Sequence, residues 1–161
     1  GSDSILLAAR LKRLNCEGKL AIDIGSGGGI QAITLSTDPN TKVIAIDINE
    51  KGLRYGKINA IINKKTNIYF VKSDMLSAVR AGIDTIVSNP PFIFLPHSQK
   101  SLNRDGYGGA FGLEKIIYIL QKLPEYLNPG GKAILLTLSP LICGKDILIE
   151  EVKKLFNKNY V

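Results

Sequence analysis

Short apolar runs alternate with amphipathic stretches along almost the whole chain. The runs are nearly continuous in hydrophobic residues, a pattern typical of strands that are buried on both faces of a parallel sheet. We predict the following strands from these runs: Leu20–Ile24, Lys42–Asp47, Ile68–Val71, Ile83–Ser88 and Lys132–Leu138.

Segments with helical periodicity lie between these runs. The predicted helices are a first one capped by Asp3 or Ser4 and ending near Leu14, then Ile30–Ser36, Glu50–Ile62, a short turn of helix at Met75–Arg80, Leu113–Leu127 and Ile147–Phe156. Pro129-Gly130-Gly131 is predicted to form a turn. Alternating strands and helices indicate an α/β fold, a doubly wound and mainly parallel sheet with helices on both faces. Ligands bind such sheets at the carboxyl ends of the strands.

Length and composition favour one globular domain over residues 1–161. Hydrophobic residues make up 45% of the 161 residues, and no apolar run approaches the ~20 residues of a membrane span. No signal-peptide pattern is present, so we expect a cytoplasmic protein that does not contact a membrane. Cys16 and Cys143 are far apart, without the spacing of a metal site, and we expect reduced thiols and no metal.

The net charge of +7 indicates a polyanionic neighbour such as nucleic acid. The basic residues are scattered along the chain, however, and a solvated basic surface explains the charge equally well.

A glycine cluster follows the first predicted strand, at Asp23-Ile24-Gly25-Ser26-Gly27-Gly28-Gly29. Glycines there let the chain bend sharply and let a ligand approach the backbone. The pattern also fits a dinucleotide fingerprint, with Asp47 about twenty residues further on, so a nicotinamide-dependent oxidoreductase is a competing interpretation. Asp23 opposes it, because a carboxylate beside the loop would repel a pyrophosphate and attract a sulfonium or an ammonium.

Two further acids end predicted strands. Asp47, after the second strand, is suited to accept from the two hydroxyls of a ribose, although it could instead cap the following helix. Asp74 and Met75 follow the third strand, where the carboxylate could accept from an adenine amino group while Met75 packs on the ring. Asp74 could equally cap a short helix.

The most specific motif is Asn89-Pro90-Pro91-Phe92, which closes the fourth strand. Two prolines remove two backbone donors and leave a rigid edge of carbonyl acceptors, to which the Asn89 oxygen adds another. Such an edge can hold both hydrogens of an NH2 group and aim its lone pair at a methyl donor. Phe92 offers a flat face for a planar amide or base.

Together, the glycine loop, Asp47 and the Asn-Pro-Pro-Phe motif resemble the class I S-adenosylmethionine-dependent amino-methyltransferases. That group includes HemK-type glutamine methyltransferases of release factors, adenine DNA methyltransferases and guanine rRNA methyltransferases. The resemblance covers about residues 3–156, and the HemK branch with its small-domain relatives is the nearest part of the group.

The resemblance implies a specific set of site residues. The expected S-adenosyl-L-methionine ligands are Asp23, Gly25, Ser26, Gly27, Asp47, Ile48, Asp74, Met75 and Asn89. Asn89, Pro90, Pro91 and Phe92 are the expected catalytic residues, with Asn89 and Pro90 holding the target nitrogen. Leu95–Gly112 is predicted to be a lid; its His97, Lys100 and Arg104 receive no assigned role.

Two features depart from the resemblance. HemK motifs usually end in Tyr where Phe92 stands, and the antiparallel hairpin that closes this fold after the last helix is missing, as in a truncated or reduced domain.

The sequence therefore predicts a methyl transfer from S-adenosyl-L-methionine to a planar NH2 nitrogen. The acceptor is a protein glutamine amide, as in a release factor, or an exocyclic base amine of RNA or DNA. A nicotinamide-dependent oxidoreductase and a non-catalytic cofactor-binding subunit remain the alternatives.

Overall fold

The computed structural model describes residues 2–13, 19–91 and 112–156. The chain divides into two compact units. The first unit comprises residues 1–89 and 126–136, and the second comprises residues 90–125 and 137–161.

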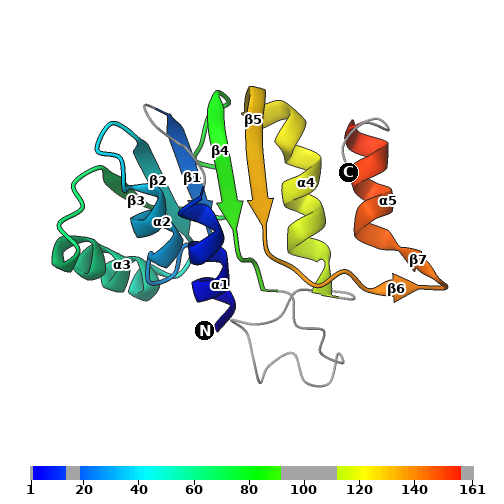
Figure 1. Ribbon diagram of the computed structural model, residues 1–161, viewed down its shortest axis with the longest axis horizontal. Coiled ribbons are helices and arrows are strands. Elements are labelled where there is room, and N and C mark those ends of the chain that lie inside the picture. Colours follow the sequence, from blue (N-terminus) through cyan, green and yellow to red (C-terminus); the bar gives the residue numbers. More distant parts are fainter. Residues whose placement is uncertain (1, 14–18, 92–111, 157–161) are drawn as a thin grey trace. The chain divides into compact units, whose positions relative to one another are not determined.

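The first unit is built on a parallel sheet (Figure 1). Its strands are β1 (Leu20–Ile24), β2 (Lys42–Asp47), β3 (Ile68–Lys72), β4 (Ile83–Ser88) and β5 (Leu127–Leu135). Their order is β3-β2-β1-β4-β5, and every neighbouring pair is parallel. The sheet runs outward in both directions from β1, so β1 and β4 end side by side, with Ile24 opposite Ser88. This is the switch point at which doubly wound sheets bind ligands, and the predicted fold class is confirmed.

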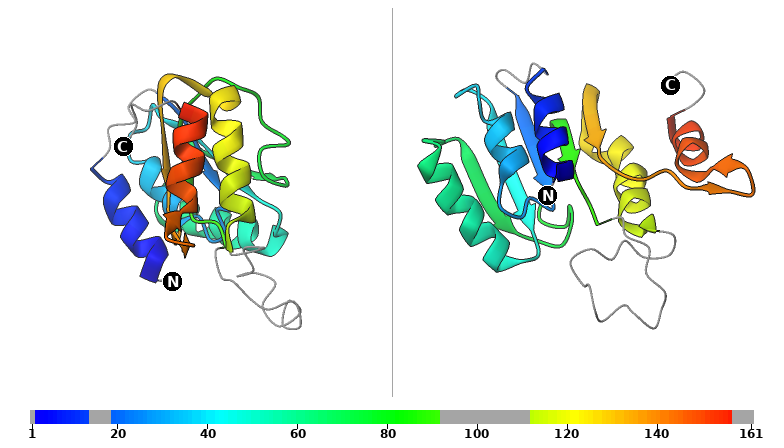
Figure 2. Two further views of the ribbon diagram at one scale, coloured as in Figure 1. Left: turned by 90° about the vertical axis from the view of Figure 1, so that its right-hand side faces the viewer. Right: turned by 60° about the horizontal axis from the view of Figure 1, so that its bottom comes forward.

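Three helices of the first unit, α1 (Ser2–Leu11), α2 (Ile30–Leu35) and α3 (Glu50–Ile62), cover one face of this sheet (Figures 1 and 2). The core beneath α1 and α2 contains Leu7, Leu11, Ala21, Ala32, Leu35, Val43, Ala45 and Val87. Each leucine buried there contributes roughly 1.5–3 kcal/mol. Alanines at the sheet surface let the helix backbones lie close to the strands, which fixes the start of α2 beside the carboxyl end of β1.

The start of the first helix differs from the prediction. Ser4 was expected to be a candidate cap, but α1 begins at Ser2 and includes both Asp3 and Ser4. The Ser4 hydroxyl accepts instead from the side chain of Asn89. A tertiary hydrogen bond therefore takes the place of the predicted capping bond.

The predicted short helix at Met75–Arg80 is wrong. Residues 74–78 form a bend and a turn, and Met75 has a φ of 50°, which is outside the helical region. The Ser73 hydroxyl accepts from the amide of Ala78, while the Ser77 hydroxyl donates to the carbonyl of Asp74. These local side-chain bonds compete with helical ones.

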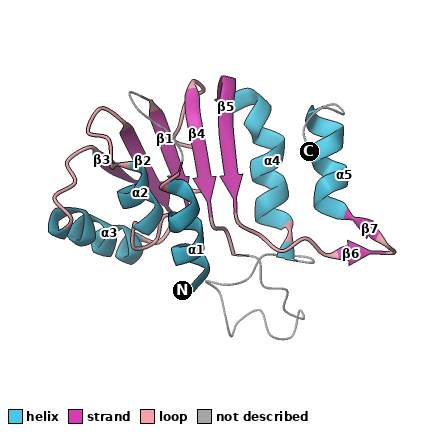
Figure 3. Cartoon of the chain, in the orientation of Figure 1, coloured by secondary structure: helices cyan, strands magenta, loops and turns pink. Residues whose placement is uncertain are grey.

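The predicted turn at Pro129-Gly130-Gly131 also differs, because β5 begins earlier, at Leu127, and contains these residues. Figure 3 draws β5 as one strand. The register shifts there: Ile83 pairs with Leu127, and Thr85 pairs with Lys132. Asn128 donates to the Asp84 carboxylate over 2.8 Å and ties the irregular segment to β4. The strand itself ends at Leu135.

The second unit contains α4 (Glu114–Tyr126, apart from its last residue), the two-residue strands β6 (Leu141–Ile142) and β7 (Lys145–Asp146), and α5 (Ile147–Phe156). Strands β6 and β7 form an antiparallel hairpin before α5, which the sequence did not predict. Within this unit Gln121 of α4 donates to Glu151 of α5 over 3.3 Å. No helix in the described ranges is long and apolar enough to cross a membrane.

Candidate functional site

The loop between β1 and α2 is an ordered series of tight turns. Gly25, Gly27 and Gly29 have φ values of 72°, 47° and 81°, which favour glycine. A Cβ at Gly25 or Gly27 would meet nothing within 4 Å, so the backbone conformation rather than crowding favours glycine at these two positions. The open space above them leaves the loop backbone accessible to a ligand.

This loop is held from below by β2. The amides of Gly25 and Ser26 both donate to the carbonyl of Ile46, over 2.8 and 2.9 Å. The amide of Gly29 donates to the carbonyl of Ser26 over 2.8 Å, which closes the turn into α2. The loop is therefore fixed by backbone bonds at the carboxyl edge of the sheet.

A cavity of about 480 Å³ lies over this loop. Its lining residues are Ser4, Ile5, Gly25, Ser26, Gly27, Gly28, Ile30, Gln31, Asn59 and Asn89. Small-molecule sites in proteins occupy ~300–1,000 Å³, so the cavity is large enough for a cofactor.

Two polar atoms at this cavity are buried without a hydrogen-bond partner among the described residues: the Ser26 hydroxyl oxygen and the side-chain oxygen of Asn89. Leaving a buried polar atom unpaired costs ~1–3 kcal/mol, and native proteins rarely tolerate it without a reason. Both atoms belong to residues predicted to be functional. A ligand that donates hydrogen bonds would satisfy them.

The orientation of the Asn89 amide is set by α1. Its nitrogen donates to the Ser4 hydroxyl over 3.1 Å. The carbonyl of Ser4 in turn accepts from the Gln31 side chain over 3.2 Å. Because the nitrogen is engaged by Ser4, the acceptor oxygen is the atom of Asn89 that remains available.

Asp23 lies behind the loop, 1% exposed, and does not belong to the cavity lining just given. Its carboxylate accepts from the amide of Ala32, in the first turn of α2, over 3.0 Å. Burial raises the pKa of Asp23 to about 7; the bond from Ala32 opposes this shift and the nearby charge of Asp47 adds to it. Asp23 was predicted to contact a ligand directly. In this structure it acts on the cavity indirectly, by holding the first turn of α2 in place.

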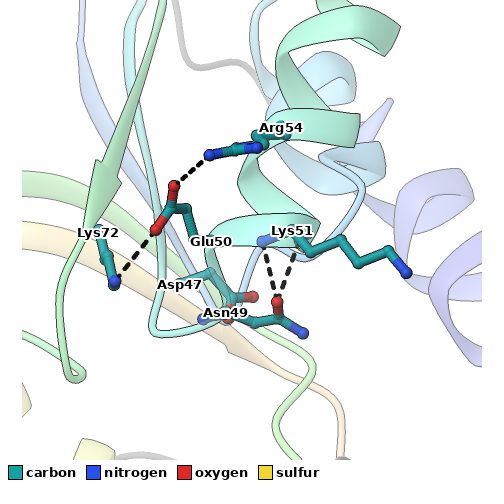
Figure 4. Close-up of polar contacts among 7 residues, drawn as sticks. Asp47, Asn49, Glu50, Lys51, Arg54 and Lys72 are labelled. Carbon is teal, nitrogen blue, oxygen red and sulfur yellow. Dashed lines mark hydrogen bonds and ion pairs between the residues drawn. The ribbon is translucent and has the colours of Figure 1, made fainter.

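Asp47 already binds the glycine loop. One of its oxygens accepts from the amide of Gly27 over 2.7 Å, and the other accepts from the amide of Asn49 over 2.8 Å. The helix cap that was considered for Asp47 is supplied by Asn49, whose side chain accepts from the amides of Lys51 and Gly52 (Figure 4). Each carboxylate oxygen has two lone pairs, so Asp47 keeps acceptor capacity for a ligand.

The remaining predicted residues are at the neighbouring strand ends. Ile48 is 65% exposed directly after β2. Asp74 is exposed and Met75 half-buried in the turn after β3. These three residues and Asp47 are outside the lining of the 480 Å³ cavity as the described residues form it.

The rest of the Asn-Pro-Pro-Phe motif is only partly described. Pro90 and Pro91 follow Asn89 in the chain. Phe92 lies outside the described residues, as do His97, Lys100, Arg104 and all of the predicted lid except Gly112.

Sequence reasoning missed the contribution of α1 and α3 to the cavity. Ser4, Ile5 and Asn59 line it, and the Asn59 side chain donates to the carbonyl of Gly28 over 2.9 Å. No local signal marks these residues, because their partners are far away in the chain.

The family model for the methyltransferase small domain matches residues 2–157. The chain belongs to this family. The match confirms the predicted class of enzyme, an S-adenosyl-L-methionine-dependent methyltransferase, and it does not favour the nicotinamide-dependent oxidoreductase.

Relatives and solved structures agree with the family. A protein of Methanocaldococcus jannaschii, provisionally named a protein N5-glutamine methyltransferase, is 32% identical over 95% of this chain and 77% of its own length. A release factor glutamine methyltransferase of Buchnera aphidicola is 31% identical over 79% of this chain and 49% of its own length. The crystal structure of a methyltransferase from Pyrococcus furiosus superposes with a TM-score of 0.67 at 27% identity, covering 94% of this chain and 68% of that one. The chain thus spans about half of the release factor enzyme.

Proposed function

We propose that this chain transfers a methyl group from S-adenosyl-L-methionine to the side-chain amide of a glutamine in a protein. The observation that carries the proposal is the buried side-chain oxygen of Asn89, which has no hydrogen-bond partner in the part of the chain that the structure describes. It lies at the carboxyl end of β4, next to the glycine loop, in the cavity that the loop lines.

We assign the methyl donor to the glycine loop and the adjoining strand ends. Gly25 and Gly27 offer open backbone, and Ser26 offers a hydroxyl that no described residue bonds. Asp47 offers carboxylate acceptors suited to ribose hydroxyls. Ile48, Asp74 and Met75 complete the proposed donor site at the ends of β2 and β3. Asp23 lies behind the loop, and its ionised form contributes negative charge there, which favours a cationic ligand over a pyrophosphate.

The donor, when bound, supplies a methyl group that its positive sulfur has already activated. The protein then has to orient the acceptor, for which no nucleophilic side chain is needed. Asn89 accepts one hydrogen of the acceptor amide, and the carbonyl of Pro90 is proposed to accept the other. Two acceptors aim the nitrogen lone pair and stabilise the positive charge that develops on it. Positioning of this kind is worth up to ~7–11 kcal/mol of the barrier.

The names of the relatives favour glutamine as the acceptor. The proteins of Methanocaldococcus jannaschii and Buchnera aphidicola described above are both named as glutamine methyltransferases. An exocyclic base amine presents a similar planar NH2 group, and nucleic acid is therefore the alternative that the experiment must separate.

A variant of Asn89 tests the assigned chemistry. We expect Asn89→Ala to bind S-adenosylhomocysteine with nearly the wild-type affinity, measured by calorimetry, and to lose about 10²–10³-fold in turnover. Asn40→Ala, at an exposed asparagine far along the chain, is the matched control and should keep both. Unchanged turnover of Asn89→Ala would refute the role given to this side chain.

Labelled methyl groups identify the acceptor. The wild-type protein is incubated with S-adenosylmethionine carrying a labelled methyl group and with cell extract, and the product is treated with protease or nuclease. Protease-sensitive label that is recovered as N5-methylglutamine after complete enzymatic digestion, and as methylamine after acid hydrolysis, supports the proposal. Nuclease-sensitive label would show that the acceptor is a base amine of a nucleic acid and not a glutamine.

A further inference from the structure

The outward face of α3 exposes four large apolar side chains beside its charged ones. This helix packs on the sheet through Leu53, Gly56 and Ala60. Its opposite side carries an outer stripe made of Tyr55, Ile58, Ile61 and Ile62, which are 55%, 52%, 75% and 70% exposed. A helix on the surface of a globular protein normally has charged or polar residues there, and a helix that is apolar all round is normally buried.

The outer stripe borders a groove. Tyr55 and Ile58 line a groove of about 600 Å³ together with Glu50, Lys51 and Arg54, the exposed residues of the first turns of α3. Exposed apolar surface that is contiguous and rimmed by polar residues marks interaction sites. This groove lies on the solvent side of α3, whereas the loop cavity is lined from α3 by Asn59.

The rim of the stripe is positively charged. Residues 50–64 contain four exposed basic side chains, Lys51, Arg54, Lys57 and Lys64, and one acidic side chain, Glu50, which gives a net charge of four minus one, or +3. Glu50 is held by Arg54 at 2.7 Å and by Lys72 at 3.3 Å (Figure 4). These two cations lower the pKa of Glu50, which is consequently ionised and already paired. The rim therefore favours an acidic partner.

We propose that the outer stripe of α3 is a docking surface for a partner protein that presents an apolar strip flanked by Asp or Glu side chains. Complementary charge would steer the encounter, and the isoleucines would supply the buried area. The site is separate from methyl transfer and does not depend on the proposed acceptor.

The same residues argue against two other occupants. A second copy of this chain, docked through the same patch by a twofold axis, would bring the basic rim against itself. Nucleic acid would match the charge, but three of the four stripe residues are isoleucines, which cannot stack on bases as aromatic side chains do.

The test uses two short synthetic amphipathic helices with one leucine strip, one flanked by glutamates and the other by lysines. Binding to the whole protein is followed by fluorescence anisotropy. We expect the glutamate peptide to bind at least about tenfold more tightly than the lysine peptide, and less tightly as salt rises. The double variant Ile58→Ser with Ile62→Ser should weaken binding at least about tenfold. Its matched control, Leu138→Ser with Leu141→Ser, changes residues 62% and 70% exposed elsewhere and should leave binding unchanged.

Replacing basic side chains of α3 by acidic ones gives a result that loss of folding could not produce. Lys51→Glu with Lys57→Glu should reverse the preference between the two peptides while the circular dichroism spectrum is kept. Equal binding of both peptides, or no binding, would overturn the proposal. Displacement of the glutamate peptide by poly-uridine RNA would reassign the surface to nucleic acid, and a doubled mass in light scattering that the isoleucine variant abolishes would reassign it to self-association.

Discussion

Replacing Asp23 by asparagine tests the consequence of burying an acid behind the glycine loop. Burial raises the pKa of Asp23 from its ordinary value of 3.8 to about 7, because the ionised form loses its hydration. Asparagine has nearly the same shape, and its oxygen can still accept from the amide of Ala32, as the carboxylate does over 3.0 Å. The substitution thus removes the titration and keeps the hydrogen bond.

The sign follows from proton binding. With a folded pKa above the unfolded one, the folded state binds more protons between about pH 4 and pH 7. The stability that wild-type Asp23 provides is complete below about pH 4 and is lost as the pH rises through about 7. About three pH units at ~1.4 kcal/mol each give a cost on the order of 4 kcal/mol for the ionised form. Asparagine avoids this cost, but its buried amide nitrogen, if left without a hydrogen-bond acceptor, destabilises the variant by ~1–3 kcal/mol.

We therefore expect Asp23→Asn to be more stable than the wild type by roughly 1–3 kcal/mol at pH 8, which is ~2–12 °C in Tm for a domain of this size. The difference should fall by about 2–3 kcal/mol between pH 8 and pH 5. Urea unfolding followed by circular dichroism at several pH values measures it. Asp3→Asn, at an exposed acid, is the control and should show no such dependence. A stability difference that stays constant from pH 5 to 8 would show that Asp23 is ionised throughout and that the reasoning is wrong.

Two further substitutions test how helices hold the site. Ser4→Ala frees the Asn89 amide to rotate, so kcat should fall several-fold while the affinity for S-adenosylhomocysteine stays unchanged. Ser4→Thr should restore kcat, and Ser2→Ala, at an exposed serine, should have no effect. Equal kcat for Ser4→Ala and the wild type would contradict the orienting bond. A Cβ at Gly56 would lie 2.5 Å from the ring of Phe70, so Gly56→Ala should lower the free energy of unfolding by ~1–3 kcal/mol. Adding Phe70→Leu should recover part of this loss. A rise in Tm for Gly56→Ala alone would mean that the ring moves aside freely.

The centre of the sheet could be predicted from the sequence because its three inner strands, β2, β1 and β4, are largely buried. β1, β2 and β4 have the predicted bounds, since each is a mainly apolar run next to a turn signal or a capping residue. Asn49 gives α3 its predicted start by accepting from two amides of the first turn. Local chemistry determined these elements, and local chemistry is visible in one sequence.

The error at Met75–Arg80 comes from local side-chain bonds of Ser73 and Ser77, but other errors arise where a distant residue decides the conformation. Pro129 and the two glycines after it have the composition of a turn, but pairing of Leu127 with Ile83 and the bond from Asn128 to Asp84 extend the strand across them. The site shows the same division. The strand-end residues could be proposed for the site from their position, whereas the hydrogen bond between Ser4 and Asn89 spans 85 residues and could not be predicted in this way.

The cross-links of the glycine loop bear on how quickly a ligand can bind. Ile46, Asp47 and Asn59 each hydrogen-bond the loop, so its shape is set before any ligand arrives. Such preorganisation means that association need not wait for the loop to rearrange, and little chain entropy is lost at that step. The association rate of the ligand should then be limited by diffusion into the cavity. Any slower step of binding should come from a rearrangement outside the glycine loop.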